Sequence, residues 1–254
     1  MRPLLFIADL HLDAANPRTL DLFRRFCREQ ASEAHALYIL GDLFEAWIGD
    51  DADDSAARTT RQALAELSAH GTEILLLHGN RDFLLGQRFI ASCGGRLLPD
   101  PSVIEWQGQR VALCHGDSLC TADTDYQFLR DRLRSPEVKA ALLAQPRSAR
   151  EAMAREAREA SRQSGANKPE AIMDVTQEAV DAMLDTLDAD VMIHGHTHRP
   201  ADHRWQHEGR SRQRLVVGAW TDGADYVVAD SARLTLRRCP GEVHCENETE
   251  DPRS

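Results

Sequence analysis

This chain of 254 residues lacks long hydrophobic runs, paired cysteines and an excess of positive charge. No apolar run approaches the roughly 18 residues that span a bilayer, which excludes a membrane-spanning helix. The apolar stretch at residues 4–8 is too short for a signal peptide, and no small-residue cleavage site follows it. The six cysteines contain no C-x-x-C pair, so neither a disulfide framework nor a zinc ribbon is expected. We therefore expect an unexported protein with reduced thiols.

Acidic residues outnumber basic ones by 41 to 30, which gives a net charge of −11 with neutral histidines. A nucleic-acid coat needs a net basic surface, so no nucleic-acid partner is expected. The charge is unevenly distributed. Residues 126–168 carry ten Lys and Arg against five Asp and Glu, so this segment is +5 and the remainder of the chain is −16. The acidic residues 241–254 are predicted to form a disordered tail.

Short apolar runs recur along the chain, and each ends in a polar cluster. Such runs fit strands that are buried on both faces, and they lie at residues 4–8, 36–40, 74–77, 111–114 and 191–193. Apolar residues with helical spacing lie between the first of them, as at Leu20, Phe23 and Cys27. Alternating strands and helices predict an α/β layered sheet. Strand patterns after residue 200 predict that a sheet finishes as antiparallel β.

Residues 121–188 have helical patterns broken at Pro136, at Pro146 and at 165–169. We interpret them as a helical insertion between two polar strand ends. The predicted organisation is one domain over residues 1–240, with a helical cap at 121–172 inserted within it.

The polar clusters all follow predicted strands, and ligand sites of open α/β sheets lie outside the carboxyl ends of the strands. One fold can therefore bring them together. The clusters are Asp9-Leu10-His11, Gly41-Asp42, Gly79-Asn80-Arg81-Asp82, His115-Gly116-Asp117 and Gly195-His196-Thr197-His198. Their oxygen and imidazole donors, without thiolate, suit Mn²⁺, Fe²⁺ or Zn²⁺.

Seven ligands are more than one tetrahedral ion can use, so two metal ions fit these residues better than one. If Asp42 bridges, Asp9, His11 and one distal histidine can hold the first ion. Asn80, His115 and the other histidine can then hold the second ion, about 3.5–4 Å away. Such a pair lowers the pKa of a shared water and clamps a phosphoryl oxygen, which implies hydrolysis at phosphorus.

The motifs D-x-H, G-D, G-N-[HR]-D, H-G and G-H-x-H, in this order, resemble the calcineurin-like metallophosphoesterase superfamily. Longer strings narrow the match, namely residues 41–51, 78–84, 115–121 and 194–200. They are similar to the UDP-2,3-diacylglucosamine pyrophosphatases, a family of hydrolases in lipid A biosynthesis. The similarity runs from the N-terminus to about residue 230 and includes the helical insertion.

The resemblance implies a four-layer αββα sandwich with a helical cap and two Mn²⁺ ions per chain, with Fe²⁺ or Zn²⁺ still possible. The implied reaction is water attack on the α-phosphorus of UDP-2,3-diacylglucosamine, which gives UMP and 2,3-diacylglucosamine 1-phosphate. The implied metal ligands are Asp9, His11 and His198 on one ion, Asn80, His115 and His196 on the other, and Asp42 between them. Asp42, Asn80, Arg81 and His115 are the implied catalytic residues.

The resemblance also implies substrate contacts, partners and a location. The implied contacts are Asn80, Arg81, Asp123, Ser161, Gly165, Lys168 and His196, where Ser164 is an alternative to Gly165. The implied partners are the UDP-diacylglucosamine lipid and an anionic membrane surface, and the location is cytoplasmic, peripheral to the inner membrane. The basic insertion has three interpretations: a solvated helical face, a docking surface for anionic lipid, or a cap over an acyl groove. We favour a cap with a membrane-facing exterior.

Arg81 has an independent chemical interpretation, because many relatives in the superfamily carry histidine at this position of the G-N-x-D motif. A sugar 1-phosphate is a stable leaving group, so a general acid gains little, whereas a fixed guanidinium that neutralises diphosphate charge gains more. His78 and His194 are interpreted as core histidines, and Asp82 and Asp117 as turn or supporting partners. Two alternative functions are a soluble nucleotide-sugar or dinucleoside-polyphosphate hydrolase, and a metal-poor scaffold that binds partners.

Overall fold

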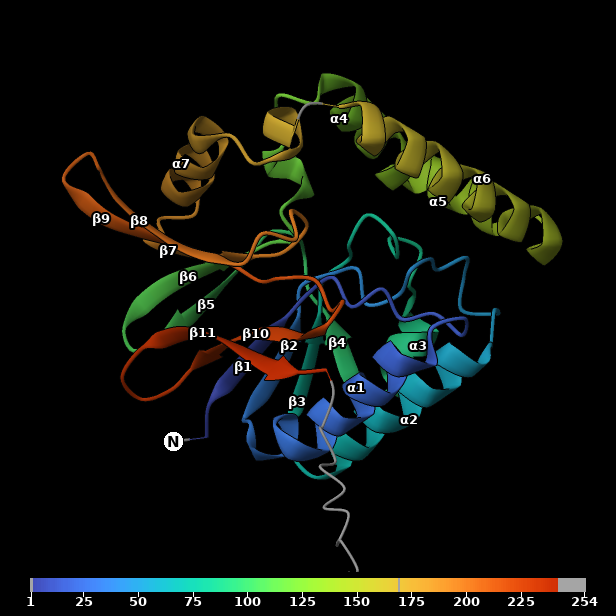
Figure 1. Cartoon of the computed structure of the whole chain (residues 1–254), viewed down its shortest axis with the longest axis horizontal. Helices are drawn as coiled ribbons and strands as arrows, with labels where there is room; N and C mark the ends of the chain where they lie inside the picture. The colour runs from blue at the N-terminus through green and yellow to red at the C-terminus, as the bar shows by residue number, and fades with distance from the viewer. Residues whose placement is uncertain (1, 169, 242–254) are drawn as a thin grey trace, which may run out of the picture.

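Two β-sheets pack face to face, with helices on both outer sides (Figure 1). The structure, a computed structural model, describes residues 2–168 and 170–241, without the side chains of residues 162, 164–167, 170 and 171. This architecture confirms the predicted four-layer αββα fold. The predicted acidic tail lies outside the described residues, apart from Gly241.

Six strands form the first sheet, in the order β11-β10-β1-β2-β3-β4. The central strands β1, β2 and β3 are parallel, whereas β10 and β11 are antiparallel, as predicted for the end of the chain. Their bounds are β1 (Leu4–Ile7), β2 (Ala36–Ile39), β3 (Glu73–Leu76), β4 (Gly95–Leu97), β10 (Gly223–Ala229) and β11 (Leu234–Pro240). The outer face is covered by α1 (Pro17–Glu29), α2 (Ser55–Ala69) and α3 (Gln87–Ser92), and the short helix η1 (Ala31–Glu33) follows α1.

Five strands form the second sheet, in the order β5-β6-β7-β9-β8. Its strands β6, β7 and β9 are parallel to one another, and the two edge strands are antiparallel to their neighbours. Their bounds are β5 (Ser102–Trp106), β6 (Gln109–Leu113), β7 (Val191–His194), β8 (Ala201–His207) and β9 (Arg210–Val216). On its outer face lies α7 (Gln177–Thr186), which buries Val180 and Leu184.

The central strands bury both of their faces, which explains their continuous apolar sequences. In β1, Leu5 and Ile7 belong to the core beneath α1 and α2, while Phe6 belongs to the core between the two sheets. Successive side chains of a strand point to opposite faces, so a strand inside a four-layer sandwich needs an apolar residue at every position.

The predicted insertion forms α4 (Thr124–Arg134), α5 (Pro136–Leu143), α6 (Arg147–Asn167) and the short helix η3 (Glu170–Met173). Pro136 begins α5 and Pro146 precedes α6, so both proline breaks are confirmed. The predicted break from residue 165 is wrong at its start, because α6 continues to Asn167. Figure 1 shows α4–α6 above the loops at the upper end of the sandwich, and we refer to these helices as the cap. The domain boundaries at 121–172 and 1–240 stay a prediction.

Three strands and one helix have no counterpart among the predicted elements, namely β4, β5, β8 and α3. Edge positions explain the strands, because β4, β5 and β8 each pair on one side only and need no continuous apolar sequence. Within the described residues, no helix is both long and apolar enough to cross a membrane. The five cysteines of the described part are free thiols, and Cys245 lies outside that part.

Candidate metal centre

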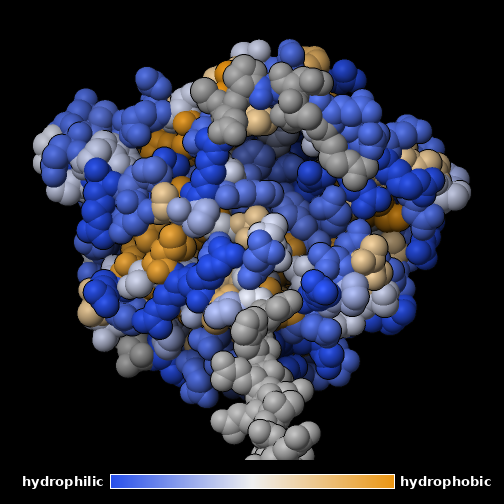
Figure 2. All heavy atoms as spheres, viewed as in Figure 1, coloured by the Kyte–Doolittle hydropathy of each residue, from blue (hydrophilic) through white to orange (hydrophobic). Residues whose placement is uncertain are grey.

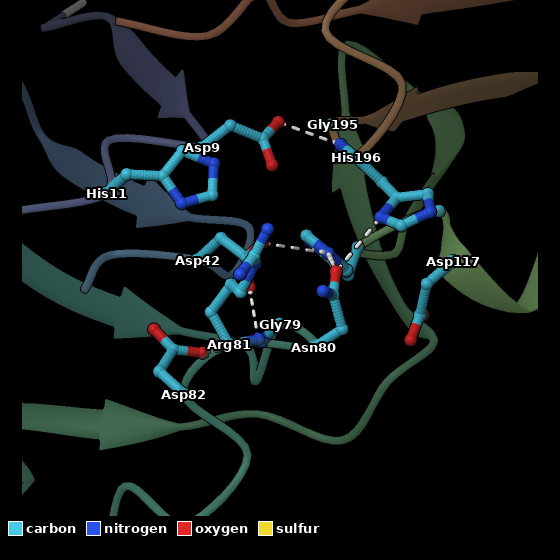
Figure 3. A network of polar contacts seen from close by, with 12 residues as sticks. Asp9, His11, Asp42, Gly79, Asn80, Arg81, Asp82, Asp117, Gly195 and His196 are labelled. Carbon is cyan, nitrogen blue, oxygen red and sulfur yellow. Dashed lines mark hydrogen bonds and ion pairs between the residues drawn. The ribbon is translucent and has the colours of Figure 1, made fainter. Parts of the chain in front are cut away.

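The carboxyl ends of five strands carry the predicted metal ligands. β1, β2 and β3 are parallel in one sheet and β6 and β7 in the other, so their ends open onto one edge of the sandwich. Figure 3 shows side chains from both sheets converging there. The residues brought together are Asp9, His11, Asp42, Asn80, His115, His196 and His198.

Asp9, His11 and His198 form a first group whose donor atoms lie within 4.8 Å of one another. The Nε2 atoms of the two histidines are 3.2 Å apart, and Oδ1 of Asp9 is 3.6 Å from Nε2 of His198. Oδ1 of Asp9 is buried and accepts no hydrogen bond from the residues that the structure describes. A cation would satisfy this oxygen and both facing nitrogens, so the group fits a metal ion.

Asn80, His115 and His196 form a second group around one oxygen. Oδ1 of Asn80 is 2.9 Å from Nε2 of His115 and 3.0 Å from Nδ1 of His196. The other ring nitrogen of His115 lies 2.9 Å from the carbonyl oxygen of Leu40 and donates to it, so in the neutral ring Nε2 carries a lone pair. That lone pair faces the oxygen of Asn80, and either a proton or a metal ion must lie between them.

Asp42 lies between the two groups. Its Oδ2 is 3.7 Å from Nε2 of His115, and it forms a potential metal site with Asp9 and His115. Burial raises the pKa of Asp42 to about 6, so this carboxylate needs neighbouring positive charge. Burial would lower the pKa of His115, but the negative charge of Asp42 and the other nearby carboxylates raises it to about 9. Protons and metal ions therefore compete for this centre.

The backbone at these ligands adopts an unusual conformation. Five of the seven residues have a φ between 50° and 68°, namely Asp9, His11, Asp42, His196 and His198. This left-handed region disfavours residues with a side chain, and such strain concentrates at functional sites. The approach at Gly79 is also tight, because a Cβ there would lie 2.0 Å from Oδ1 of Asp42.

Asp82 joins two of the ligand-bearing loops. Its Oδ1 accepts a hydrogen bond from the backbone of Gly79 at 2.8 Å, and its Oδ2 accepts one from the backbone of Leu43 at 2.8 Å. It thereby ties the loop that holds Asp42 to the loop that holds Asn80. The prediction that Asp82 is a turn partner is confirmed.

Asp117 links the centre to the cap. It is fully buried, and its Oδ2 accepts hydrogen bonds from Tyr126, Arg130 and Arg134 of α4 at 2.8–3.0 Å. Burial would raise the pKa of Asp117, but His115 and the two guanidinium groups hold it well below its usual range. The predicted supporting role of Asp117 is confirmed. The ring of Tyr126 also stacks on His196, with centroids 5.9 Å apart, a contact that the sequence analysis did not identify.

Glu45 is a second neighbour of the centre that the sequence analysis assigned no role. Its carboxylate lies 3.3 Å from Nδ1 of His11 and 3.7 Å from Nη1 of Arg81. Arg81 also donates its backbone N–H to Oδ1 of Asp42 at 2.7 Å. The sequence feature that could have indicated this role is the position of Glu45, three residues after the predicted bridging ligand Asp42 and in the same motif.

The predicted substrate contacts divide into two sets. Asn80, Arg81 and His196 belong to the metal centre. Asp123 precedes α4 and Lys168 follows α6, and these two residues form an ion pair with each other. Nζ of Lys168 is 2.6 and 2.7 Å from the carboxylate oxygens of Asp123. Ser161 is exposed on α6. The surroundings of residues 164 and 165 lie outside the described part, so the choice between them stays open.

Other polar residues near the motifs have structural partners. His194 is buried, and its ring contacts the carbonyl oxygen of Gly195 at 2.8 Å and Arg214 at 3.1 Å. His78 contacts the carbonyl oxygen of Leu85 at 2.7 Å. His194 is therefore a core histidine, as predicted, whereas His78 is hydrogen-bonded as predicted but only half-buried. The acidic run at residues 50–54 forms a loop that ends at Asp54, the N-cap of α2.

Comparisons with known proteins agree with these motifs. A family model described as calcineurin-like phosphoesterase matches residues 2–200. A protein named UDP-2,3-diacylglucosamine hydrolase from Stenotrophomonas maltophilia (strain K279a) is 47% identical over 239 residues, which cover 91% of this chain and 96% of the relative. A protein of the same name from Marinobacter nauticus is 45% identical over 237 residues, covering 93% and 97%. Another from Azotobacter vinelandii is 48% identical over 216 residues, covering 85% and 90%.

Proposed function

Since the chain belongs to the UDP-2,3-diacylglucosamine hydrolases, a family of calcineurin-like phosphoesterases, we propose that it hydrolyses the diphosphate of UDP-2,3-diacylglucosamine. The products are UMP and 2,3-diacylglucosamine 1-phosphate, a step of lipid A biosynthesis. The observation that supports this best is the convergence of two groups of metal-binding side chains on Asp42, with Arg81 beside them.

We propose two Mn²⁺ ions per chain. Asp9, His11 and His198 hold the first, Asn80, His115 and His196 hold the second, and Asp42 is shared. These donors also suit Fe²⁺ or Zn²⁺. When bound, the pair supplies a water of lowered pKa and positive charge at the reacting phosphorus.

The protein prepares this site by fixing the direction of its donor atoms. The carbonyl oxygen of Leu40 holds the proton of His115 on Nδ1, which leaves Nε2 directed into the centre. The backbone N–H of Arg81 holds Oδ1 of Asp42 at 2.7 Å, which leaves Oδ2 directed at His115. Little reorganisation is then required when the substrate binds.

Arg81 is the proposed anchor for the diphosphate. Its side chain is one-quarter exposed at the edge of the centre, where a charged ligand can reach it. With a sugar 1-phosphate as the leaving group, protonation contributes little to the rate, and neutralisation of the departing charge contributes more. A guanidinium stays protonated at any working pH and suits this role.

The cap supplies an apolar surface for the acyl chains. Its exposed large hydrophobic residues are Phe128, Leu129, Leu143 and Met153. Figure 2 shows one face of the molecule, where hydrophilic residues predominate and hydrophobic residues form separate small groups. We propose that acyl chains lie against apolar residues of the cap while Asp123, Ser161 and Lys168, with residue 164 or 165, contact the polar part of the substrate.

The outside of the cap is the proposed contact with an anionic membrane. Residues 126–168 carry a net charge of +5. In polybasic segments, each Lys or Arg near an anionic membrane contributes about 1 kcal/mol to the free energy of binding. We expect the protein to sediment with vesicles that contain anionic phospholipid at low salt and to be released at high salt. Equal binding to neutral vesicles would refute an electrostatic contact.

Hydrolysis is tested with purified protein, Mn²⁺ and UDP-2,3-diacylglucosamine. UMP should be released, and both Asp42→Ala and His115→Ala should abolish its release. The exposed residues Asp21 and His35 offer matched controls, so Asp21→Ala and His35→Ala should retain activity. In water labelled with ¹⁸O, the label should appear in UMP, and label found only in the sugar phosphate would refute attack on the α-phosphorus.

Two results would favour the alternatives. If UDP-sugars without acyl chains are cleaved as fast as the diacylated substrate, the protein is a soluble nucleotide-sugar hydrolase. If fewer than about one ion per chain binds after loading with Mn²⁺, the hydrolytic mechanism fails and the scaffold interpretation gains support, because two-metal hydrolysis needs both sites filled.

A further inference from the structure

Glu45 contacts the candidate metal centre and the proposed diphosphate anchor at the same time. Oε2 of its carboxylate is 3.3 Å from Nδ1 of His11, and Oε1 is 3.7 Å from Nη1 of Arg81. The two oxygens therefore face two different partners, and rotation of the carboxylate would disturb both contacts. The side chain of Glu45 is 29% exposed, so its contacts are partly shielded from water.

The backbone fixes Glu45 in this place. Its N–H donates to the carbonyl oxygen of Leu12 at 3.1 Å, and Leu12 in turn donates to Leu43 at 2.9 Å. Leu12 and Phe44 also form an isolated parallel β-bridge. The loop after β1, which carries His11, and the loop after β2, which carries Glu45, are thus joined before any side chain is considered.

Glu45 is placed beside Nδ1 of His11. Its Nδ1 atom is buried and has no well-aligned hydrogen-bond acceptor among the residues that the structure describes, so the carboxylate of Glu45 is the anionic group in contact with it. A carboxylate at Nδ1 keeps the proton on that nitrogen and leaves Nε2 as the donor atom. Nε2 of His11 is the atom that faces His198 at 3.2 Å in the first group.

Arg81 has a fixed backbone and a less constrained side chain. Its N–H is held by Asp42 and its carbonyl oxygen by Trp47, whereas Glu45 is the acid that faces its guanidinium. A long side chain loses rotamer freedom when a ligand orders it, so a neighbour that already restrains it favours binding. Glu45 supplies that restraint. At 3.7 Å its contact with the guanidinium of Arg81 is loose enough for the diphosphate to replace it.

We propose that Glu45 is a positioning residue that orients the metal ligand His11 and the guanidinium of Arg81 together, so that the metal centre and the diphosphate anchor adopt one shared arrangement. This inference rests on the proposed function and adds a residue to it. Glu45 acts through His11 and Arg81 and does not itself contact the reacting atoms.

The experiment compares Glu45→Gln and Glu45→Ala with a matched control. Glu73 offers this control, because its exposed carboxylate also lies between a histidine, His35, and an arginine, Arg96. It is at the amino end of β3, whereas the centre lies at the carboxyl end of that strand. Mn²⁺ binding to the metal-free protein is measured by titration calorimetry. Loss of an outer partner of a metal ligand weakens metal binding about 10–100-fold, so we expect this loss at one of two sites in Glu45→Ala and a smaller loss in Glu45→Gln.

The link to Arg81 is tested by kinetics at saturating Mn²⁺. KM should rise in Glu45→Ala, and the double variant with Arg81→Ala should be no worse in KM than Arg81→Ala alone, because Glu45 affects diphosphate binding only through the side chain of Arg81. Glu73→Gln should match the wild type in both measurements. Wild-type Mn²⁺ affinity together with additive effects on KM would overturn the proposal, even if Glu45→Ala lowers Tm.

Failure of the proposed function has a different signature. If the wild-type protein releases no UMP from the lipid substrate, the assigned activity fails. The Mn²⁺ titration still decides whether Glu45 orients His11.

Discussion

Replacing Arg150 with alanine should loosen the cap from the sandwich without unfolding the sandwich. Arg150 lies on α6 and is only 6% exposed. Its Nη1 donates to Oδ1 of Asp51 at 2.8 Å, its Nη2 donates to the other carboxylate oxygen, and its Nε donates to the carbonyl oxygen of Gln145 at 3.0 Å. Nη1 also donates to the carbonyl oxygen of Ile48. One guanidinium therefore fastens the cap to the loop before α2.

The expected size of the effect follows from these contacts. Hydrogen bonds to charged groups contribute about 1.5–3 kcal/mol each. Asp51 is half exposed, so water solvates its carboxylate when the arginine is removed. This solvation offsets most of the free energy lost with the ion pair. We therefore expect the free energy of cap opening to fall by about 2 kcal/mol, which is roughly a 30-fold rise in the open population.

Hydrogen exchange measures this opening directly. In Arg150→Ala the amides of α5 and α6 should exchange roughly 30-fold faster, while those of β1, β2 and β3 should keep wild-type rates. Arg147→Ala is the matched control on the same helix. Arg147 pairs with Glu151 at 2.9 Å on the surface, and an exposed i,i+4 pair contributes about 0.3–0.5 kcal/mol, so exchange should change by less than about threefold.

Two results would refute this reasoning. Equal acceleration in both variants would show that the contacts of Arg150 contribute no more than a surface pair. Acceleration spread over β1–β3 in Arg150→Ala would show that the cap and the sandwich open as one unit.

Three further variants test the centre and the thiols. Gly79→Ala would place a Cβ 2.0 Å from Oδ1 of Asp42, so UMP release should fall at least about 100-fold, and near-normal activity would contradict the close approach. Asp82→Asn replaces one carboxylate oxygen, so one of the two backbone N–H groups that Asp82 accepts from loses its acceptor. The unfolding free energy should fall by about 1–3 kcal/mol, and Tm should fall by about 2–4 °C per kcal/mol. An unchanged Tm would show that these hydrogen bonds contribute nothing to stability. In the variant Cys245→Ser, a thiol reagent at pH 8 should modify Cys239 quickly and the other cysteines only after unfolding. The reason is that burial raises the pKa of both the Cys93 and the Cys120 thiol to about 12. Rapid modification of several thiols in the folded protein would contradict this prediction.

The central strands could be predicted from the sequence because the fold requires apolar residues on both of their faces. Residues 36–40 and 191–193 are apolar throughout, and they form β2 and β7 in the middle of the two sheets. The edge strand β8 (Ala201–His207) is mostly polar and one face is solvated, so its sequence resembles a loop. Its pairing with β9 depends on the neighbouring strand, which local periodicity does not encode.

The ligand-bearing loops could be predicted for a related reason. Each cluster follows a buried strand, and parallel strands bring their carboxyl ends to one edge. The role of Tyr126 could not be predicted, because nothing in the sequence of α4 indicates that its ring stacks on His196, 70 residues further along the chain. Contacts between the cap and the centre depend on how α4 packs, which is a tertiary property.

The distribution of charge shows how one protein can hold cations and bind an anionic lipid. Carboxylates crowd the centre, and their field raises the pKa of His115 to about 9 despite its burial. Such a field attracts metal ions and repels a diphosphate. Positive charge lies instead on Arg81 and on residues 126–168, at the edge of the centre and in the cap above it. A diphosphate can therefore approach the centre only where metal ions and Arg81 offset the carboxylates, so its affinity must depend on metal occupancy. The net charge of −11 is a sum over the whole chain and does not reveal that negative and positive charge lie in different parts of it.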